Sequence, residues 1–130
     1  MQKPRPTNGL RHVALFTQHF TAAQHFYTNL LGMKIVWQPD ADNLYLSTGT
    51  DNLALHRAPA DFVAGKNQRL DHIGFFLAKR EDVDAWHDYL VANHVPIAHP
   101  PKDHRDGTRS FYCKDPDGNV VQMIYYPLKS

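Results

Sequence analysis

The sequence predicts an α+β fold made of two tandem βαβββ modules, and two observations lead to this fold class. The first is a repeated opening, Leu-x-His followed by an apolar run, which occurs at residues 10–17 and again at 70–77. The second is that each opening is followed by one helical pattern and then by three short strand patterns. We therefore divide a single domain of residues 1–130 into a module at 9–57, a connection at 58–68 and a module at 69–127.

Each opening is predicted to be a strand, because it is short, rich in β-branched and aromatic residues, and bounded by polar residues. In the first module, apolar residues then recur at helical spacing as far as Gly32, which provides a C-terminal stop. In the second module, Pro96 lies just beyond the expected helix end. The helical stripes are Ala22, Ala23, Phe26, Tyr27, Leu30 and Leu31 in the first module, and Val83, Trp86 and Leu90 in the second.

Three short runs follow each helix and are expected to complete the sheet of each module. Turn-forming residues separate these runs at Pro39-Asp40, at 49–52 and at 115–118. A module of about 60 residues buries only about 60% of its surface, so we expect the two modules to pack together. The runs are 33–37, 44–47 and 53–57 in the first module, and 97–99, 110–114 and 119–126 in the second.

Composition limits the classes of function. Fourteen Lys and Arg against thirteen Asp and Glu give a formal charge of +1, too even for the positive field that nucleic-acid binding requires. No run approaches the ~18 apolar residues of a membrane span. The single cysteine, Cys113, cannot form an intrachain disulfide and fits a reducing compartment. We therefore expect a cytoplasmic protein that binds neither nucleic acid nor membrane.

Nine histidines are present, and His12 and His72 occupy matching positions in the two openings. If the modules pack about a pseudo-twofold axis, the two imidazoles converge and begin a metal site. Gln122 is the polar residue within the otherwise apolar run that ends the second module, and a buried amide needs partners. Gln122 is therefore the third candidate ligand. The alternatives are core histidines bonded to the backbone and a glutamine left at an inactive site.

Several features together resemble the vicinal oxygen chelate superfamily of glyoxalases, extradiol dioxygenases, fosfomycin-resistance transferases and bleomycin-binding proteins. They are the doubled βαβββ pattern, the Leu-x-His openings, Phe26-Tyr27 before residues 30–33, and the sequence Asp-Pro-Asp-Gly-Asn at 115–119. The resemblance implies a curved mixed-sheet half-barrel, a homodimer and a small-molecule substrate. It places a divalent ion, Fe(II), Mn(II), Ni(II) or Zn(II), on His12, His72 and Gln122, the last standing where the family usually has glutamate. A fourth position, used by glyoxalases, falls on Ala54, which cannot ligate.

Residues 104–118 resemble the extradiol dioxygenase signature of a histidine, a six-residue gap, an apolar residue, a tyrosine and a Pro-x-Gly turn. Lys102 departs from the opening of that signature. The resemblance implies that His104 and Tyr112 are catalytic groups, which donate hydrogen bonds or protons to a bound oxygen anion. Ser110 and Tyr112 also match substrate positions of the fosfomycin-resistance group. The predicted substrate-binding residues are His56, Ser110, Arg109 and Phe76.

Two functions follow as hypotheses. The first is a metal-dependent enzyme that chelates two adjacent substrate oxygens and performs extradiol-like dioxygenation or glyoxalase-like isomerisation. The second is a metal-free protein of the bleomycin-resistance type, which holds a hydrophobic small molecule in the same cavity. We expect Phe16, Phe76, Tyr112 and Tyr125 to line that cavity, Trp37 to pack in the core, and Cys113 to face the side of its strand opposite Tyr112.

Overall fold

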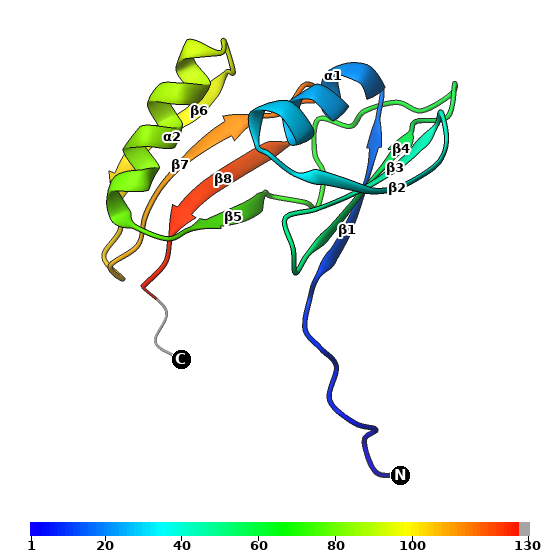
Figure 1. Cartoon of the computed structure of the whole chain (residues 1–130), viewed down its shortest axis with the longest axis horizontal. Coiled ribbons are helices and arrows are strands. Elements are labelled where there is room, and N and C mark those ends of the chain that lie inside the picture. Colours follow the sequence, from blue (N-terminus) through cyan, green and yellow to red (C-terminus); the bar gives the residue numbers. More distant parts are fainter. Residues whose placement is uncertain (128–130) are drawn as a thin grey trace. The chain divides into compact units, whose positions relative to one another are not determined.

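The computed structural model describes residues 1–127 and divides the chain into two compact units, with the boundary between Phe62 and Val63. Each unit has one four-stranded mixed sheet and helical structure packed on it (Figure 1). The element order is strand, helix, strand, strand, strand in both units, which confirms the α+β class and the doubled βαβββ pattern. The boundary falls inside the predicted connection at 58–68.

The first unit contains β1 (His12–Thr17), α1 (Phe20–Gln24), a π-helical stretch η1 (His25–Leu30), β2 (Lys34–Asp40), β3 (Asn43–Ser47) and β4 (Asn52–Arg57). Its strand order is β1-β4-β3-β2, with β1 parallel to β4 and the other pairs antiparallel. One face of the sheet supplies the core with alternating leucines, which are buried together with apolar residues of the helices. These buried residues are Leu15, Leu44, Leu46, Leu53, Leu55, Phe20, Ala23, Phe26 and Tyr27.

The helical segment of the first unit follows the predicted stripe but widens halfway. The hydroxyl of Thr28 donates to the carbonyl of Gln24 at 2.6 Å, a side-chain bond that competes with regular helical hydrogen bonding at that carbonyl. The segment ends before Gly32, whose φ of +82° lies in the left-handed region that favours glycine. The predicted stop at Gly32 is confirmed.

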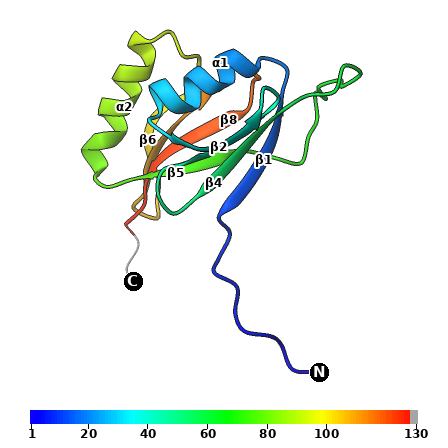
Figure 2. The same cartoon turned by 45° about the vertical axis from the view of Figure 1, so that its right-hand side comes forward.

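The second unit contains β5 (Ile73–Leu77), α2 (Arg80–Ala92), β6 (Ile97–Asp103), β7 (Arg109–Lys114) and β8 (Val120–Tyr125). Its strand order is β5-β8-β7-β6, again with a parallel first pair. Helix α2 lies across one face of this sheet (Figure 2). Strand β6 is longer than expected and passes through Pro100 and Pro101, which an edge strand tolerates because it has no ladder partner on one side.

The two sheets have the same register. Ala14 pairs with Ala54 in the first unit, and Gly74 pairs with Gln122 in the second. Ala14 and Gly74 each stand two residues after the histidine that opens their module. Gln122 and Ala54 are therefore equivalent positions, and the amide of the second unit corresponds to a methyl group in the first.

Trp37 and Cys113 show how edge and central strands differ. Trp37 was expected in the core, but it is 58% exposed and stacks on the ring of Tyr45 with centroids 4.9 Å apart. The reason is that all residues of β2, an edge strand, are exposed. Cys113, on the central strand β7, is fully buried, and burial raises the pKa of its thiol to about 12. No helix among residues 1–127 is both long and apolar enough to cross a lipid bilayer.

The turn that leads into β8 depends on Asp115, whose buried carboxylate accepts the backbone N–H groups of Asp117 and Asn119 at 2.9 and 2.8 Å and the side-chain amide of Asn119 at 2.9 Å. We expect Asp115→Ala to lower the free energy of unfolding by about 2 kcal/mol, because these donors lose their acceptor. Urea denaturation measures the change. Asp61→Ala, at an exposed site, is the control, and an equal loss of stability in both variants would contradict this role.

Candidate functional site

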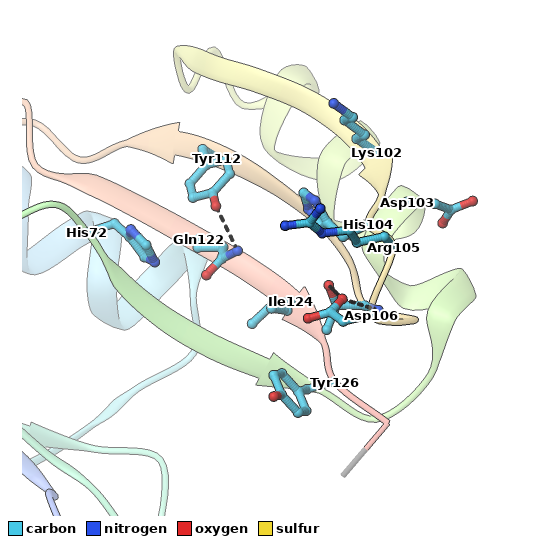
Figure 3. A pocket seen from close by; sticks show the side chains of 11 residues that line it. His72, Lys102, Asp103, His104, Arg105, Asp106, Tyr112, Gln122, Ile124 and Tyr126 are labelled. Carbon is cyan, nitrogen blue, oxygen red and sulfur yellow. Dashed lines mark hydrogen bonds between the residues drawn. The ribbon is translucent and has the colours of Figure 1, made fainter.

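A pocket of about 590 Å³ lies on the second unit, over the sheet face that does not carry α2 (Figure 3). This volume is within the range of about 300–1,000 Å³ that small-molecule sites occupy. The pocket is built from one residue of β7, from alternate residues along β8 and just beyond its end, from the residue that precedes β5, from the last two residues of β6, and from the loop between β6 and β7. Its lining residues are His72, Lys102, Asp103, His104, Arg105, Asp106, Thr108, Tyr112, Gln122, Ile124 and Tyr126.

Gln122 lies at the floor of this pocket and is 8% exposed. Its Nε2 donates to Ser110 Oγ at 3.1 Å and to Tyr112 Oη at 3.0 Å, so both amide hydrogens have acceptors. Its Oε1 points to the side of His72 (Figure 3). A Cβ at Gly74 would lie 3.5 Å from Oε1, so the lack of a side chain there leaves this oxygen open. The expectation that a buried amide needs partners is confirmed, and its carbonyl oxygen is available to a ligand.

His72 directly precedes β5 and is half-buried at the pocket wall. Its Nδ1 is 2.6 Å from Oδ1 of Asp71. Because a carboxylate only accepts, Nδ1 carries the hydrogen and Nε2 of the neutral ring keeps its lone pair. Metal-binding histidines are commonly oriented in this way, by a carboxylate on the other ring nitrogen. The ring also packs edge-on against Tyr112, with centroids 5.3 Å apart.

His12 of the first unit has a similar arrangement. It opens β1 in register with Asn52 of β4, and its Nδ1 is 2.6 Å from the Oδ1 of that residue. The amide oxygen accepts from Nδ1 and leaves Nε2 of the neutral ring with its lone pair. His56, a predicted substrate residue, also lies in the first unit. Its Nδ1 is 2.6 Å from Asn43 Oδ1, and its ring meets that of Tyr45 edge-on.

His104, Ser110, Gln122 and Tyr112 form one continuous hydrogen-bonded chain. His104 Nε2 is 2.9 Å from Ser110 Oγ, which also accepts from Gln122. Ser110 is 1% exposed, so it connects the pocket residues from below and does not line the pocket itself. Tyr112 accepts from Gln122 through its hydroxyl oxygen, which leaves the hydroxyl hydrogen available for a ligand. The pocket therefore offers one donor at Tyr112 and one acceptor at Gln122.

Arg109 is held outside the pocket. Its guanidinium binds both carboxylate oxygens of Asp84 on α2, at 2.8 and 3.0 Å, and Asp103 at 3.1 Å. These hydrogen bonds raise the pKa of Arg109, and the bond from Arg109 lowers the pKa of Asp84. Arg80 of α2 binds the same Asp103 at 2.7 Å and the carbonyl of Gly107 at 2.8 Å. Arg109 thus fastens the end of β6 to α2, and Arg80 fastens the loop that follows it.

Of the four aromatic residues expected to line the cavity, Tyr112 lines this pocket, whereas Phe16, Phe76 and Tyr125 do not. Tyr125 faces the other side of its strand. Its ring lies under the guanidinium of Arg80, 5.4 Å from centroid to Cζ, because it alternates along the chain with the pocket residues Ile124 and Tyr126. Tyr126 takes the expected place and stacks on Phe76, which is 66% exposed, with centroids 5.7 Å apart. Phe16 contacts Phe62 within the first unit, with centroids 5.6 Å apart.

Sequence reasoning missed several residues that shape the site. Asp71 is adjacent to His72, so the dipeptide itself was a signal. The role of Asn52 beside His12 can be recognised only from the register between β1 and β4, which pairs the two residues. The cations Lys102 and Arg105 and the ring of Tyr126 also line the pocket without having been predicted as site residues.

The donor atoms of the second unit suit a divalent cation in type. Nε2 of His72 is an imidazole nitrogen and Oε1 of Gln122 is an amide oxygen, and both are neutral ligands that divalent first-row metals accept. Among residues 1–127, no group of three or more His, Cys, Asp or Glu side chains is placed to hold a metal. Gln122, the amide donor beside His72, is a residue type outside that group.

The chain was compared with known protein families, curated proteins and solved structures. The Glyoxalase/Bleomycin resistance protein/Dioxygenase superfamily matches residues 9–123. A search of curated proteins returns no significant match.

Among solved structures, lactoylglutathione lyase from Agrobacterium tumefaciens has a TM-score of 0.75 at 22% identity over 93% of this chain and 96% of that one. A glyoxalase-related enzyme from Fulvimarina pelagi has a TM-score of 0.76 at 16% identity, over 93% and 90%. A glyoxalase/bleomycin resistance protein/dioxygenase from Alicyclobacillus acidocaldarius has a TM-score of 0.70 at 22% identity, over 96% of both chains. These likenesses show a shared fold, and together with the family match they establish that the chain belongs to the Glyoxalase/Bleomycin resistance protein/Dioxygenase superfamily.

Proposed function

We propose that the protein is a divalent-metal-dependent enzyme of this superfamily, with His72 and Gln122 as ligands and His12 as the further ligand that the sequence pattern predicts. One observation carries the proposal. Each histidine has its Nδ1 held by a side-chain oxygen, and Gln122 has its Nε2 engaged by two hydroxyl groups. The atoms left open on all three side chains are therefore lone-pair donors, which is the state that ligation requires. The proposed ions are Fe(II), Mn(II), Ni(II) and Zn(II).

A bound divalent ion would supply Lewis acidity to two adjacent oxygens of the substrate. The protein side chains supply the proton chemistry beside it. The hydroxyl oxygen of Tyr112 accepts from Gln122, so its hydrogen is available to donate to a substrate oxygen that gains negative charge. His104 is hydrogen-bonded to Ser110 Oγ, and the chain through Gln122 keeps Tyr112 in place. This arrangement suits extradiol-like dioxygenation or glyoxalase-like isomerisation, both of which develop charge on vicinal oxygens.

Turnover assays with two substrate classes test the enzyme. The metal-loaded protein is assayed with catechols under oxygen and, separately, with hemithioacetals. We expect turnover of one class and a loss of about a hundredfold or more in kcat for Tyr112→Phe, because the proton donor is removed. Tyr89→Phe, on the exposed side of α2, is the matched control. Turnover of neither class by a protein that holds metal would contradict the proposal.

The second candidate is a metal-free binding protein of the bleomycin-resistance type, and Gln122 in place of a carboxylate favours it. The apolar wall of Ile124 and Tyr126, whose ring is backed by Phe76, would contact a hydrophobic ligand. Binding of an aromatic ligand that is unchanged by a chelator, in protein that binds no divalent ion, would support this function over the enzyme.

Two further properties stay predictions. We propose a homodimer, which light scattering coupled to size-exclusion chromatography tests directly. We also propose a cytoplasmic location, because the single thiol, Cys113, is buried and unpaired within residues 1–127.

A further inference from the structure

The end of β6 and the loop that follows it carry charge that the proposed chemistry does not use. Lys102 and Asp103 end β6, Arg105 and Asp106 lie in the loop, and all four line the pocket. We propose that Lys102 and Arg105 bind an anionic group of the substrate, a carboxylate or a phosphate. This inference rests on the proposed function in one respect, because it takes the same pocket as the substrate site.

Both carboxylates of residues 102–106 accept hydrogen bonds within the protein. Asp103 is shared by the guanidinium groups of Arg80 and Arg109, at 2.7 and 3.1 Å. Its carboxylate is directed away from Gln122 (Figure 3). Asp106 accepts the hydroxyl and the backbone N–H of Thr108 at 2.7 and 3.0 Å, and these bonds lower its pKa. Asp103 is therefore paired with two guanidinium groups. Asp106 keeps its negative charge, but neither carboxylate forms an ion pair with Lys102 or Arg105.

The two cations, by contrast, have no acidic partner among residues 1–127. Lys102 and Arg105 are exposed to solvent and line the pocket on the side of His104. Two cations without an ion-pair partner therefore line this end of the pocket, although the whole chain carries a formal charge of only +1.

Backbone hydrogen bonds and a contact from α2 fasten the loop. The N–H of His104 donates to the carbonyl of Thr108 at 2.8 Å, and Gly107 takes a φ of +90° that closes the turn. Arg80 fixes the carbonyl of Gly107 from α2. Since the backbone that carries Lys102 and Arg105 is already ordered, binding an anion costs chiefly the ordering of two side chains. A guanidinium also matches the paired oxygens of a carboxylate or phosphate.

An anion titration of the full-length protein, stripped of metal with a chelator, tests the proposal. Sodium phosphate and sodium benzoate are added separately at constant ionic strength while amide ¹H–¹⁵N spectra are recorded. We expect saturable shifts of the amides of residues 102–108 with at least one probe, and the stronger probe identifies the kind of anion. Lys102→Gln and Arg105→Gln should each weaken binding about tenfold, as expected for loss of one charged hydrogen bond.

Lys114→Gln is the control, because Lys114 is an exposed cation of the same unit outside the pocket lining. It should leave the affinity for the anion unchanged. Saturation by neither probe, or an affinity equal to wild type in both the Lys102 and Arg105 variants with otherwise unaltered spectra, would overturn the anion site. The titration contains no metal, so it does not depend on the ligand role of His72. A protein that binds divalent ions but no anion would overturn this inference alone.

Discussion

His72→Ala is expected to abolish stoichiometric binding of divalent metal. The substitution removes Nε2 of His72, which is free because Asp71 accepts from Nδ1 of the same ring. The remaining donors, the amide of Gln122 and the imidazole of His12, are both neutral. We expect the metal affinity to fall on the order of a thousandfold, about 4 kcal/mol. Elemental analysis of protein prepared without a histidine tag measures the bound metal, and the rise of Tm on adding metal should disappear with it.

Two further variants serve as comparisons for His72→Ala, one with an intermediate expected effect and one with none. Asp71→Asn changes the group that orients His72 and should weaken metal binding by about 10- to 100-fold, less than removal of the ligand itself. His25→Ala removes an exposed imidazole from the first unit and should retain wild-type metal content. Equal metal content in His72→Ala and His25→Ala would show that His72 is not a ligand.

Gln122→Glu is expected to strengthen divalent-metal binding about a hundredfold, because an anionic oxygen replaces a neutral one in a buried position. The hydroxyl groups of Ser110 and Tyr112, which now accept from Nε2, can donate to the new carboxylate at the same positions. Without metal, the buried charge should lower the free energy of unfolding by about 1–3 kcal/mol. Calorimetric metal titration and urea denaturation measure the two effects.

Tighter metal binding together with lower stability of the metal-free protein is the combination that a ligand role for residue 122 predicts. Gln68→Glu adds the same charge at an exposed site of the connection and should change neither quantity. The glutamate should also draw the hydroxyl hydrogen of Tyr112 away from the substrate, so tighter metal binding need not bring faster turnover. Metal affinity equal to wild type in Gln122→Glu would remove Gln122 from the ligand set.

Much of the fold follows from local pattern. Both modules were predictable, because the apolar stripes and alternating strands repeat in each half and the turn residues mark their ends. The exceptions depend on interactions that a pattern does not carry. The widening at η1 accompanies a hydrogen bond from Thr28, and Trp37 is exposed because β2 lies at the edge of its sheet. Edge position also lets β6 run on through two prolines.

The site was predictable to the extent that strand alternation and the family resemblance determine it. His72, Gln122, Tyr112 and His104 line one pocket, as a shared face implies. The misplacement of Tyr125 was avoidable, since an even spacing from Gln122 selects Tyr126. The position of Arg109 could not be predicted from the sequence. Its partner Asp84 lies 25 residues away and meets it only because α2 packs on the sheet. Which rim charges are already paired likewise depends on contacts across the fold.

The central claim is that the open atoms of these side chains hold a divalent cation, and calorimetric titration of the metal-stripped, tag-free wild-type protein tests it most directly. Mn(II), Ni(II), Zn(II) and, under anaerobic conditions, Fe(II) are titrated in turn. We predict saturable binding at a stoichiometry of one ion per chain for at least one of them, weakened in His72→Ala. Absence of saturable binding for all four ions would contradict the claim.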